Sequence, residues 1–389
     1  MARWTDWSFR RRPTRFAVHA VLAAAIALSG CAGAPDTMLV ANAVQAPDAR
    51  EHKILVATTR VRDPKPGAFY NGERSQTLDF SAFDVSVPPS HVNGHVEWPK
   101  QAPGDPRTDF VMRDGRYLSG EKEFIADLNR QLGMRPKGQR KVLFFIHGYN
   151  TQFAEGLYRF AQVVDDAKST AVPVHFSWAS RGALSEYVYD NNSATSARDR
   201  LEHVFRLVAA SDADQINILA HSMGNWVTVE AIRNIQIKGD APAAGKIGAI
   251  VLAAPDIDID VFKSQMRRIG KPKKPYLVVI SQDDRALAAS RFLAGGKNRL
   301  GDDPNEPELT SLGAIVVDLT AMEGMNAMNH DKFAEIAKIA PELDGVLNKG
   351  IGSPGGGEGA VGAIGAAVPA VLAVPASIVS APIRIIAGR

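Results

Sequence analysis

The sequence lacks several features that would assign it to other classes of protein. A single cysteine among 389 residues excludes a disulfide within the chain, and no internal repeat is visible. The formal net charge is only +3. Five arginines and one aspartate in residues 1–30 contribute +4, so the remainder carries −1. A near-neutral chain gives no support for nucleic-acid binding, which needs a basic surface to displace counterions. The length fits one large domain or two small ones.

The first thirty residues have the pattern of an export signal. Basic residues from Arg10 to Arg15 precede an apolar stretch from Phe16 to Leu28, which ends in small residues. This stretch is too short and too asymmetrically flanked for a stable membrane span. We therefore expect residues 1–30 to be a signal peptide.

The lone cysteine, Cys31, follows Leu28-Ser29-Gly30 and so resembles the lipobox of bacterial lipoproteins. In such proteins the cysteine becomes the lipidated N-terminal residue, and its acyl chains hold the domain at a membrane surface. The resemblance implies a lipid-anchored protein of the bacterial cell envelope. Ala32 after the cysteine favours the outer membrane, facing the periplasm. Ordinary secretion, with Cys31 as an incidental thiol, is the alternative.

The next segments suggest a tether and then the start of a folded domain. Residues 31–50 are rich in Ala and Pro and lack periodicity, so we expect a tether. Two β-rich runs follow, at 53–60 and 78–88, separated by turn residues from Asp63 to Arg74. Apolar residues at helical spacing predict a helix over 121–132.

From Lys141 onward, short apolar runs alternate with amphipathic stretches. Such strands predict a mostly parallel sheet covered by helices on both faces, which the earlier β runs extend at an antiparallel edge. We expect this α/β domain to span residues 51–347. The predicted strands are 141–147, 172–178, 216–221, 247–255, 275–281 and 313–319, and the predicted helices end near 167 or span 193–210, 223–235 and 331–339.

Residues 348–389 form a Gly/Ala/Pro-rich apolar tail. A Gly-rich linker precedes a stretch without charge from Val361 to Ile383. Three prolines and many small residues argue against a regular membrane helix. We expect a low-complexity tail without regular structure, and a membrane-contacting segment is the alternative.

The most informative string is LAHSMGN, from Leu219 to Asn225, which follows a predicted strand and opens a predicted helix. It has the form of the nucleophile elbow of an α/β-hydrolase, with Ala220 in place of the first glycine of G-x-S-x-G. The sharp turn needs small residues two positions before and after the serine, and it raises the hydroxyl above the sheet. Ser222 is therefore the candidate nucleophile. A serine that merely caps the following helix is the alternative.

A second string, FIHGYN from Phe145 to Asn150, ends the first strand of this section. His-Gly at this place resembles the oxyanion loop of α/β-hydrolases. The resemblance implies that the backbone N–H groups of Tyr149 and Met223 are the oxyanion donors. His147 invites a rival role as general base, but its position matches the loop, so we interpret it as structural.

The acid and the base are expected later in the chain. Asp283 and Asp284 follow the strand predicted at 275–281, where the fold places the acid. Of nine histidines only His330 lies beyond them, and its neutral imidazole is the candidate base. The order Ser222, Asp284, His330 is that of nucleophile, acid and base in this fold. Asp283 remains an alternative acid, and a helix-capping histidine is the alternative for His330.

A run of alternating aspartates, Asp256, Asp258 and Asp260, follows the strand predicted at 247–255. Such a run raises a metal site as an alternative, but no histidine cluster accompanies it. We interpret it as a loop that caps a helix. The sequence predicts no metal and no organic cofactor.

With these strings in place, residues 53–347 resemble a bacterial family of α/β-hydrolases of uncharacterised function, many of them exported. The shared strings are ILVATTR, VSVPPSHVNG, FFIHGYN, the run from Phe176 to Asp190, LAHSMGNW, and SQDDRAL with Asn-His near the end. The string SQDDRAL favours Asp284 over Asp283 as the acid. Within the run from Phe176, we expect the side chains of Trp178, Arg181, Tyr187 and Asp190 to line the mouth of the pocket; packing of the loop is the alternative for Trp178 and Tyr187.

These observations predict a serine hydrolase of the carboxylesterase or lipase type, which cleaves an ester or amide bond through an acyl-enzyme. Its partners would be a small-molecule or lipid acyl substrate and, through the anchor, a membrane. An acyltransferase or peptidase is second within this class. The alternative from another class is a non-catalytic, lipid-anchored envelope binding or scaffold protein on a hydrolase fold. An intact triad weighs against that alternative.

Overall fold

The computed structural model describes residues 37–270, 272, 274–302, 306–322, 324, 328–330, 332–334 and 384–387. Their strands are β1 (Arg50–Arg62), β2 (Tyr70–Val87), β3 (Val111–Tyr117), β4 (Lys141–Ile146), β5 (Val172–Ser177), β6 (Gln215–His221), β7 (Ile247–Ala253), β8 (Tyr276–Ile280), β9 (Ala314–Asp318) and β10 (Arg384–Ala387). All join one ten-stranded sheet in the order β10-β9-β8-β7-β6-β4-β5-β1-β2-β3. From β9 to β1 the neighbouring strands are parallel, which confirms the expected mostly parallel sheet.

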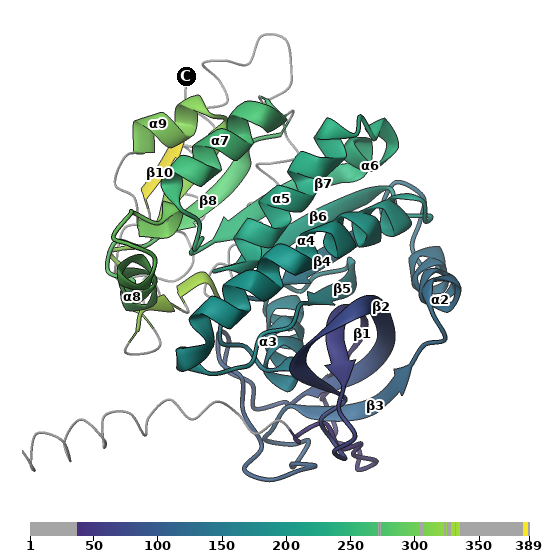
Figure 1. The fold of residues 1–389 in the computed structure, drawn as a ribbon. Helices are drawn as coiled ribbons and strands as arrows, with labels where there is room; N and C mark the ends of the chain where they lie inside the picture. The colour runs from purple at the N-terminus through teal and green to yellow at the C-terminus, as the bar shows by residue number, and fades with distance from the viewer. Residues whose placement is uncertain are drawn as a thin grey trace, which may run out of the picture.

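The described helices connect these strands and cover the sheet (Figure 1). They are α2 (Glu121–Gly133), α3 (Phe153–Asp166), α4 (Tyr187–Ala209), α5 (Gly224–Ile237), α6 (Ala241–Lys246), α7 (Ile259–Ile269), α8 (Arg285–Leu293) and α9 (Glu306–Ser311), with the short 3-10 turns η2 (Leu184–Glu186) and η3 (Leu300–Asp302). Among the described residues, no helix combines the length and the apolar character needed to cross a bilayer.

Successive side chains of a strand point to opposite faces of the sheet. Adjacent residues of the central strands therefore pack into two separate hydrophobic cores, one on each face. Phe144 packs edge-on against Phe205 of α4, with ring centroids 5.0 Å apart. Its neighbour Phe145 stacks on Phe160 of α3, at 5.2 Å. Every residue of β5, β8 and β9 is buried, as expected for strands that helices cover on both sides. The continuous apolar runs in the sequence therefore reflect two-sided burial.

The N-terminal strands extend the sheet on its antiparallel side. Strand β1 pairs antiparallel with β2, and β2 pairs antiparallel with β3. Strand β2 begins at Tyr70, eight residues earlier than the run that predicted it, so it includes part of the expected turn region. The cause is tertiary: Tyr70 is buried and packs edge-on against Phe153 of α3, at 4.8 Å.

The structure differs from the expected tether and tail. Within the expected tether, Leu39 is buried, and its N–H donates to the carbonyl of Gly67 over 2.9 Å. Apolar side chains near residue 39 thus dock on the domain and do not extend into solvent. In the expected unstructured tail, residues 384–387 form β10, which pairs antiparallel with β9 and covers that edge of the sheet. The signal peptide, Cys31 and most of the predicted helix 331–339 lie outside the described residues.

Candidate active site

Ser222 occupies a sharp turn between β6 and α5. Its φ is +51°, in the left-handed region that side chains other than glycine rarely adopt. Hydrogen bonds fix the turn on both sides. The N–H of Ser222 donates to Ala253 O (3.0 Å), and its carbonyl accepts from the Asn225 side-chain amide (2.8 Å) and from the Asp256 N–H (3.2 Å). Met223 is the N-cap of α5 and no side chain caps the helix, so Ser222 is not a helix cap.

Small residues allow the loop after β4 to approach this turn. A Cβ atom on Gly224 would lie 2.6 Å from the carbonyl oxygen of Ile146, and one on Gly148 would lie 2.6 Å from the Cβ of Ser222. Both glycines are therefore required by the close approach of two backbones. The contact places Gly148, and Tyr149 after it, directly beside the candidate nucleophile.

Four residues with strained backbones surround the same end of the sheet. Asn150, Ser222, Ala254 and Asn329 have φ between +42° and +57°. They follow β4, β6 and β7 or immediately precede His330. Such conformations cost of order 1–3 kcal/mol each and concentrate at functional sites, where the surrounding structure holds them in place. Their clustering at the carboxyl ends of the strands marks this edge as the site.

The structure brings the candidate acid and base together. Asp284 follows β8, and its Oδ2 lies 2.6 Å from Nδ1 of His330. The Asp284 side chain is fully buried, whereas that of His330 is 16% exposed. The second oxygen of Asp284 accepts from the N–H of Leu287 (3.0 Å) and so caps α8. Both carboxylate oxygens are thus fixed, which holds the imidazole in one orientation.

Asp283, the alternative acid, points elsewhere. Its carboxylate accepts from Lys332 Nζ (2.7 Å), from the Asn329 side chain (2.9 Å) and from the Ser281 hydroxyl (2.5 Å). Its pKa lies below the ordinary value, because these hydrogen bonds, led by that from Lys332, outweigh the opposing effect of burial. Asp283 therefore serves as the partner of a buried lysine, and Asp284 faces the histidine.

His221 is next to the candidate nucleophile in the sequence, and its ring contacts the candidate base. His221 immediately precedes Ser222, and its ring centroid lies 4.6 Å from that of His330 and 3.9 Å from that of Phe333. Burial, with a contribution from His330, holds the pKa of His221 well below its ordinary value. A neutral His221 therefore packs against His330 without adding a second positive charge.

His147 lies in the loop beside Ser222 but is fully engaged there. Its Nδ1 lies 2.8 Å from the Gly148 carbonyl, its Nε2 lies 3.0 Å from the Trp178 carbonyl, and its ring stacks on Trp178. Burial holds the pKa of His147 well below 6.5. These contacts support the structural interpretation of His147.

Trp178 and Asp190, in the run from Phe176 to Asp190, both pack the loop, which was the alternative expected for Trp178 but differs from the pocket-mouth position expected for Asp190. Trp178 is fully buried against His147. Asp190 is buried and accepts from the Ser180 hydroxyl (2.6 Å) and from the backbone N–H groups of Arg181 (3.0 Å) and Asn150 (3.2 Å). Burial raises its pKa. Asp190 thus ties the loop after β4 to the loop after β5.

Arg60 is a residue of this region that sequence reasoning missed. Only 1% of it is exposed, and its guanidinium donates to Ser177 Oγ (2.9 Å), the Ser180 carbonyl (2.7 Å) and the Thr151 carbonyl (2.7 Å). It therefore holds the same two loops from the side of β1. Arg60 follows the apolar run of this strand, but the strand also carries the exposed Arg50 and Arg62, so nothing in the sequence indicated that Arg60 is buried.

The aspartate run after β7 has two different roles. Asp258 caps α7 by accepting from the N–H of Asp260 (2.9 Å), and Asp260 pairs with Lys297 (3.0 Å), as a capping loop predicts. Asp256 does not share that role. It is buried and contacts Ser290 and Arg299, so the capping interpretation was wrong for this residue.

One group of side chains in the described structure has metal-ligand spacing. It comprises His91, Asp165 and Asp166, whose ligand atoms lie within 4.8 Å of one another. Cationic and amide groups of the protein already bind these carboxylates. Arg50 and His52 contact Asp165, at 2.7 and 2.9 Å. The cluster is therefore an ion-pair network near the end of α3.

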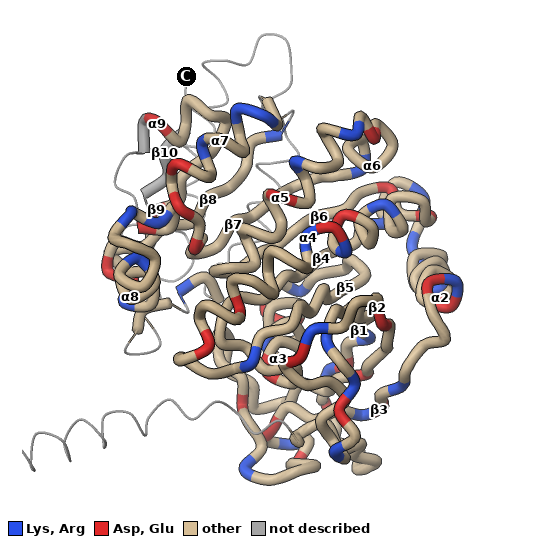
Figure 2. The backbone as a smooth tube through the Cα atoms, in the orientation of Figure 1, with Lys and Arg blue, Asp and Glu red and all other residues tan. Residues whose placement is uncertain are grey.

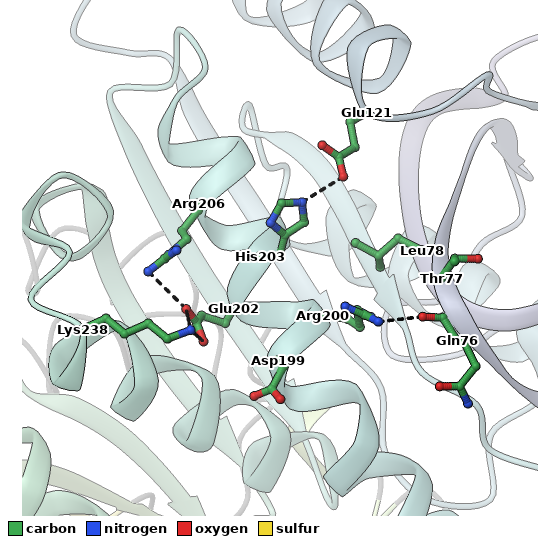
Figure 3. Close-up of a pocket in the computed structure, with 10 residues that line it drawn as sticks. All are labelled: Gln76, Thr77, Leu78, Glu121, Asp199, Arg200, Glu202, His203, Arg206 and Lys238. Atoms are coloured by element: carbon green, nitrogen blue, oxygen red, sulfur yellow. Dashed lines mark hydrogen bonds and ion pairs between the residues drawn. The ribbon is translucent and has the colours of Figure 1, made fainter.

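A surface pocket of about 470 Å³ lies away from Ser222, between the start of α2, the middle of α4 and residues 76–78 of β2 (Figure 3). Two pairs of its charged side chains are in contact: Lys238 with Glu202 (2.7 Å) and His203 with Glu121 (2.8 Å). Over the described chain, basic and acidic residues are interspersed (Figure 2). Neither feature marks a second site.

Comparison with known protein families agrees with the fold. The model of a family described as alpha/beta hydrolase of unknown function (DUF900) matches residues 121–346. A solved structure of lipase B from Aspergillus fumigatus is similar over 50% of this chain, with 12% identity and a TM-score of 0.28, which is too low to carry an argument. The match covers 48% of that lipase, so the chain spans about half its length. No curated protein matches. Because the family match covers more than half of the chain, the protein belongs to this family of α/β-hydrolases of unknown function.

Proposed function

We propose that the protein is a serine hydrolase of the carboxylesterase or lipase type, in which Ser222 is the nucleophile, His330 the general base and Asp284 the acid that orients it. The observation that carries the proposal is the 2.6 Å contact between Asp284 and His330 Nδ1, next to the strained elbow at Ser222. A carboxylate on Nδ1 fixes the tautomer in which Nε2 accepts a proton. Membership of an α/β-hydrolase family supports the same chemistry.

The reaction proposed here has two halves. Nε2 of His330 removes the hydroxyl proton of Ser222 as the oxygen attacks the substrate carbonyl, and the imidazolium returns that proton to the leaving alcohol or amine. Water, deprotonated by the same histidine, then attacks the acyl-enzyme. The imidazolium returns this proton to the Ser222 oxygen as the bond to the acyl group breaks, which releases the acid. The backbone N–H groups of Tyr149 and Met223 are the proposed donors to the oxyanion. The close approach of Gly148 to Ser222 supports the first of these.

A fluorophosphonate probe tests the nucleophile, because it reacts covalently only with an activated serine. We expect labelling of the wild-type protein and none of Ser222→Ala. Ser119→Ala, which removes a hydroxyl just before α2, is the matched control and should be labelled like wild type. Equal labelling of wild type and Ser222→Ala would overturn the proposal. A protein that is not labelled and turns over no acyl substrate, yet co-purifies with a partner, would favour the non-catalytic scaffold.

A series of nitrophenyl esters of increasing acyl length addresses the substrate. We expect hydrolysis that depends on Ser222, with the preferred chain length separating a carboxylesterase from a lipase. Amide analogues in the same assay report whether amide bonds are also cleaved. Absence of Ser222-dependent hydrolysis across both series would contradict the assignment to this class.

We further propose that the protein is lipid-anchored at Cys31 in the bacterial cell envelope, at the outer membrane facing the periplasm. The support is the lipobox-like sequence after the apolar signal. Metabolic labelling with a radioactive fatty acid should mark wild type and not Cys31→Ala. Density separation of the two membranes should place the wild type with the outer one. An unlabelled wild type in the soluble envelope fraction would instead indicate ordinary secretion.

A further inference from the structure

Asp256 is a buried carboxylate beside the candidate active site that the proposed mechanism leaves without a role. It lies three residues beyond the end of β7, and its side chain is 2% exposed. Its own backbone N–H donates to the carbonyl of Ser222 over 3.2 Å. A buried carboxylate is costly unless it is paired and hydrogen-bonded, so its contacts indicate what it holds in place.

The carboxylate of Asp256 joins three segments that are far apart in the sequence. Oδ1 accepts from the Ser290 hydroxyl of α8 (2.5 Å) and lies 3.1 Å from Nε of Arg299, just before η3. Oδ2 accepts from the Tyr187 hydroxyl at the start of α4 (3.3 Å). The arginine contact is an ion pair without hydrogen-bond alignment at Nε, and Nη2 of Arg299 donates to the Tyr187 hydroxyl (3.2 Å).

Two of these segments contact parts of the proposed catalytic site, and the main chain of Asp256 contacts a third part. Helix α8, which carries Ser290, is capped by Asp284, the proposed acid. The ring of Tyr187 packs edge-on against that of Tyr149 in the oxyanion loop, at 5.2 Å. The main chain of Asp256 binds that of Ser222. The elements of nucleophile, acid and oxyanion donor therefore meet at Asp256, the first through its backbone N–H and the other two through its carboxylate.

We propose that Asp256 is a positioning residue for the hydrolysis proposed above, on which this inference rests. It fixes the relative positions of the Ser222 turn, helix α8 with its cap Asp284, and the loop of Tyr149. The Tyr187 and Ser290 hydroxyls transmit this restraint, and Arg299 compensates the buried charge.

The charge of Asp256 has a second consequence, for the base. Arg299 and Tyr187 contact the carboxylate of Asp256, and His330 acts on it through its charge. Burial raises the pKa of Asp256, while Arg299, Ser290, His330 and Tyr187 oppose that rise. His330 is itself faced by Asp284 and His221. The attraction between Asp256 and a protonated His330 is mutual, so an ionised Asp256 favours the imidazolium that forms when Ser222 is deprotonated.

The test compares Asp256→Asn with Asp258→Asn in ester hydrolysis. Both variants remove one carboxylate from the same loop, and Asn retains the capping ability of Asp258. We expect Asp256→Asn to lower kcat by roughly 10- to 100-fold with little change in KM, because small displacements of reacting groups cost that much. In Asp256→Asn, the acid limb of the pH profile of kcat/KM should also move to lower pH. The reason is that the imidazolium form of His330 loses the stabilising negative charge of Asp256. Asp258→Asn should match wild type in both measurements.

Ser290→Ala provides a second test in case Asp256→Asn does not fold. It removes one hydrogen bond to Asp256 and keeps the charge of Asp256. We expect a lower kcat with the acid limb unmoved. If the wild type is active, and both Asp256→Asn and Ser290→Ala keep its kcat and its acid limb, the positioning role alone is overturned. A wild type no more active than Ser222→Ala would overturn the proposed function, and this inference with it.

Discussion

Two histidine–carboxylate contacts in this molecule look alike in composition but differ in geometry. In the loop after β2, His91 lies between two carboxylates, with Nδ1 2.7 Å from Glu97 and Nε2 3.0 Å from Asp166. At the candidate site, Asp284 contacts Nδ1 of His330. The His91 side chain is 1% exposed and that of His330 is 16% exposed.

The difference separates a structural histidine from one able to transfer a proton. Carboxylates on both ring nitrogens favour the doubly protonated ring, and these hydrogen bonds raise the pKa of His91 despite the opposing effect of burial. An imidazolium held in this way cannot accept a further proton. A single carboxylate on Nδ1 instead orients the ring of His330 and leaves proton exchange to Nε2 in the proposed mechanism. Chemistry therefore follows from which nitrogen is bound, and proximity to an acid alone does not establish it.

The largest expected effect distinguishes the two adjacent aspartates. Asp284→Asn should lower kcat by roughly 10³- to 10⁴-fold, because an amide at this position favours the wrong histidine tautomer. Asp283→Asn is the matched control. It should change kcat by no more than about tenfold, as its carboxylate serves Lys332, and should mainly lower stability. Ester hydrolysis and urea unfolding of both variants supply the measurements. A loss of kcat as large in Asp283→Asn would show that the acid was assigned to the wrong residue.

The second prediction concerns the histidine between two carboxylates. His91→Ala leaves the fully buried carboxylate of Asp166 without its cationic partner and should lower the free energy of unfolding by about 3–5 kcal/mol. The kcat of folded His91→Ala should stay within about twofold of the wild-type value, because the substitution moves no reacting group.

His203→Ala is the control for that variant, because it also breaks a histidine–carboxylate contact. His203 and Glu121 lie 2.8 Å apart, but both side chains are 46% exposed. Exposed pairs of this kind contribute at most about 1 kcal/mol. Similar losses of stability in the two variants, measured by urea unfolding, would contradict the structural role given to His91.

The sequence predicted those parts of the site that depend on local order along the chain. Short apolar runs predicted the central strands, because burial on both faces requires nearly every residue to be apolar. The string around Ser222 predicted a strand-to-helix turn, and the turn is present with its strained φ. The acid and the base were expected from their order along the chain, and the resemblance of SQDDRAL to family strings favoured Asp284 over Asp283. The structure places Asp284 and His330 in contact.

The parts that sequence reasoning missed depend on contacts between distant segments. Arg60 binds loops that follow β4 and β5, and Asp256 binds side chains of α4 and α8. Neither partner set can be inferred from spacing, because nothing in a single sequence shows which buried polar groups satisfy one another. The edge pairing of residues 384–387 with β9 is of the same kind. Periodicity predicts that a segment forms a strand or helix, whereas tertiary packing decides what it contacts.

The smallest expected effect is the pH dependence of stability that His91 contributes. Its folded-state pKa is raised by the hydrogen bonds to Asp166 and Glu97, although burial opposes the rise. The unfolded chain has a histidine pKa of about 6.5, so the stabilisation is fully present below that pH and is lost as the pH rises through the folded-state value. Each unit by which the pKa is raised corresponds to about 1.4 kcal/mol. The difference in unfolding free energy between wild type and His91→Ala should therefore shrink as the pH rises above about 6.5. A difference that stays constant or grows over this range would mean that His91 is neutral in the folded protein, and the contrast with His330 would then rest on burial alone.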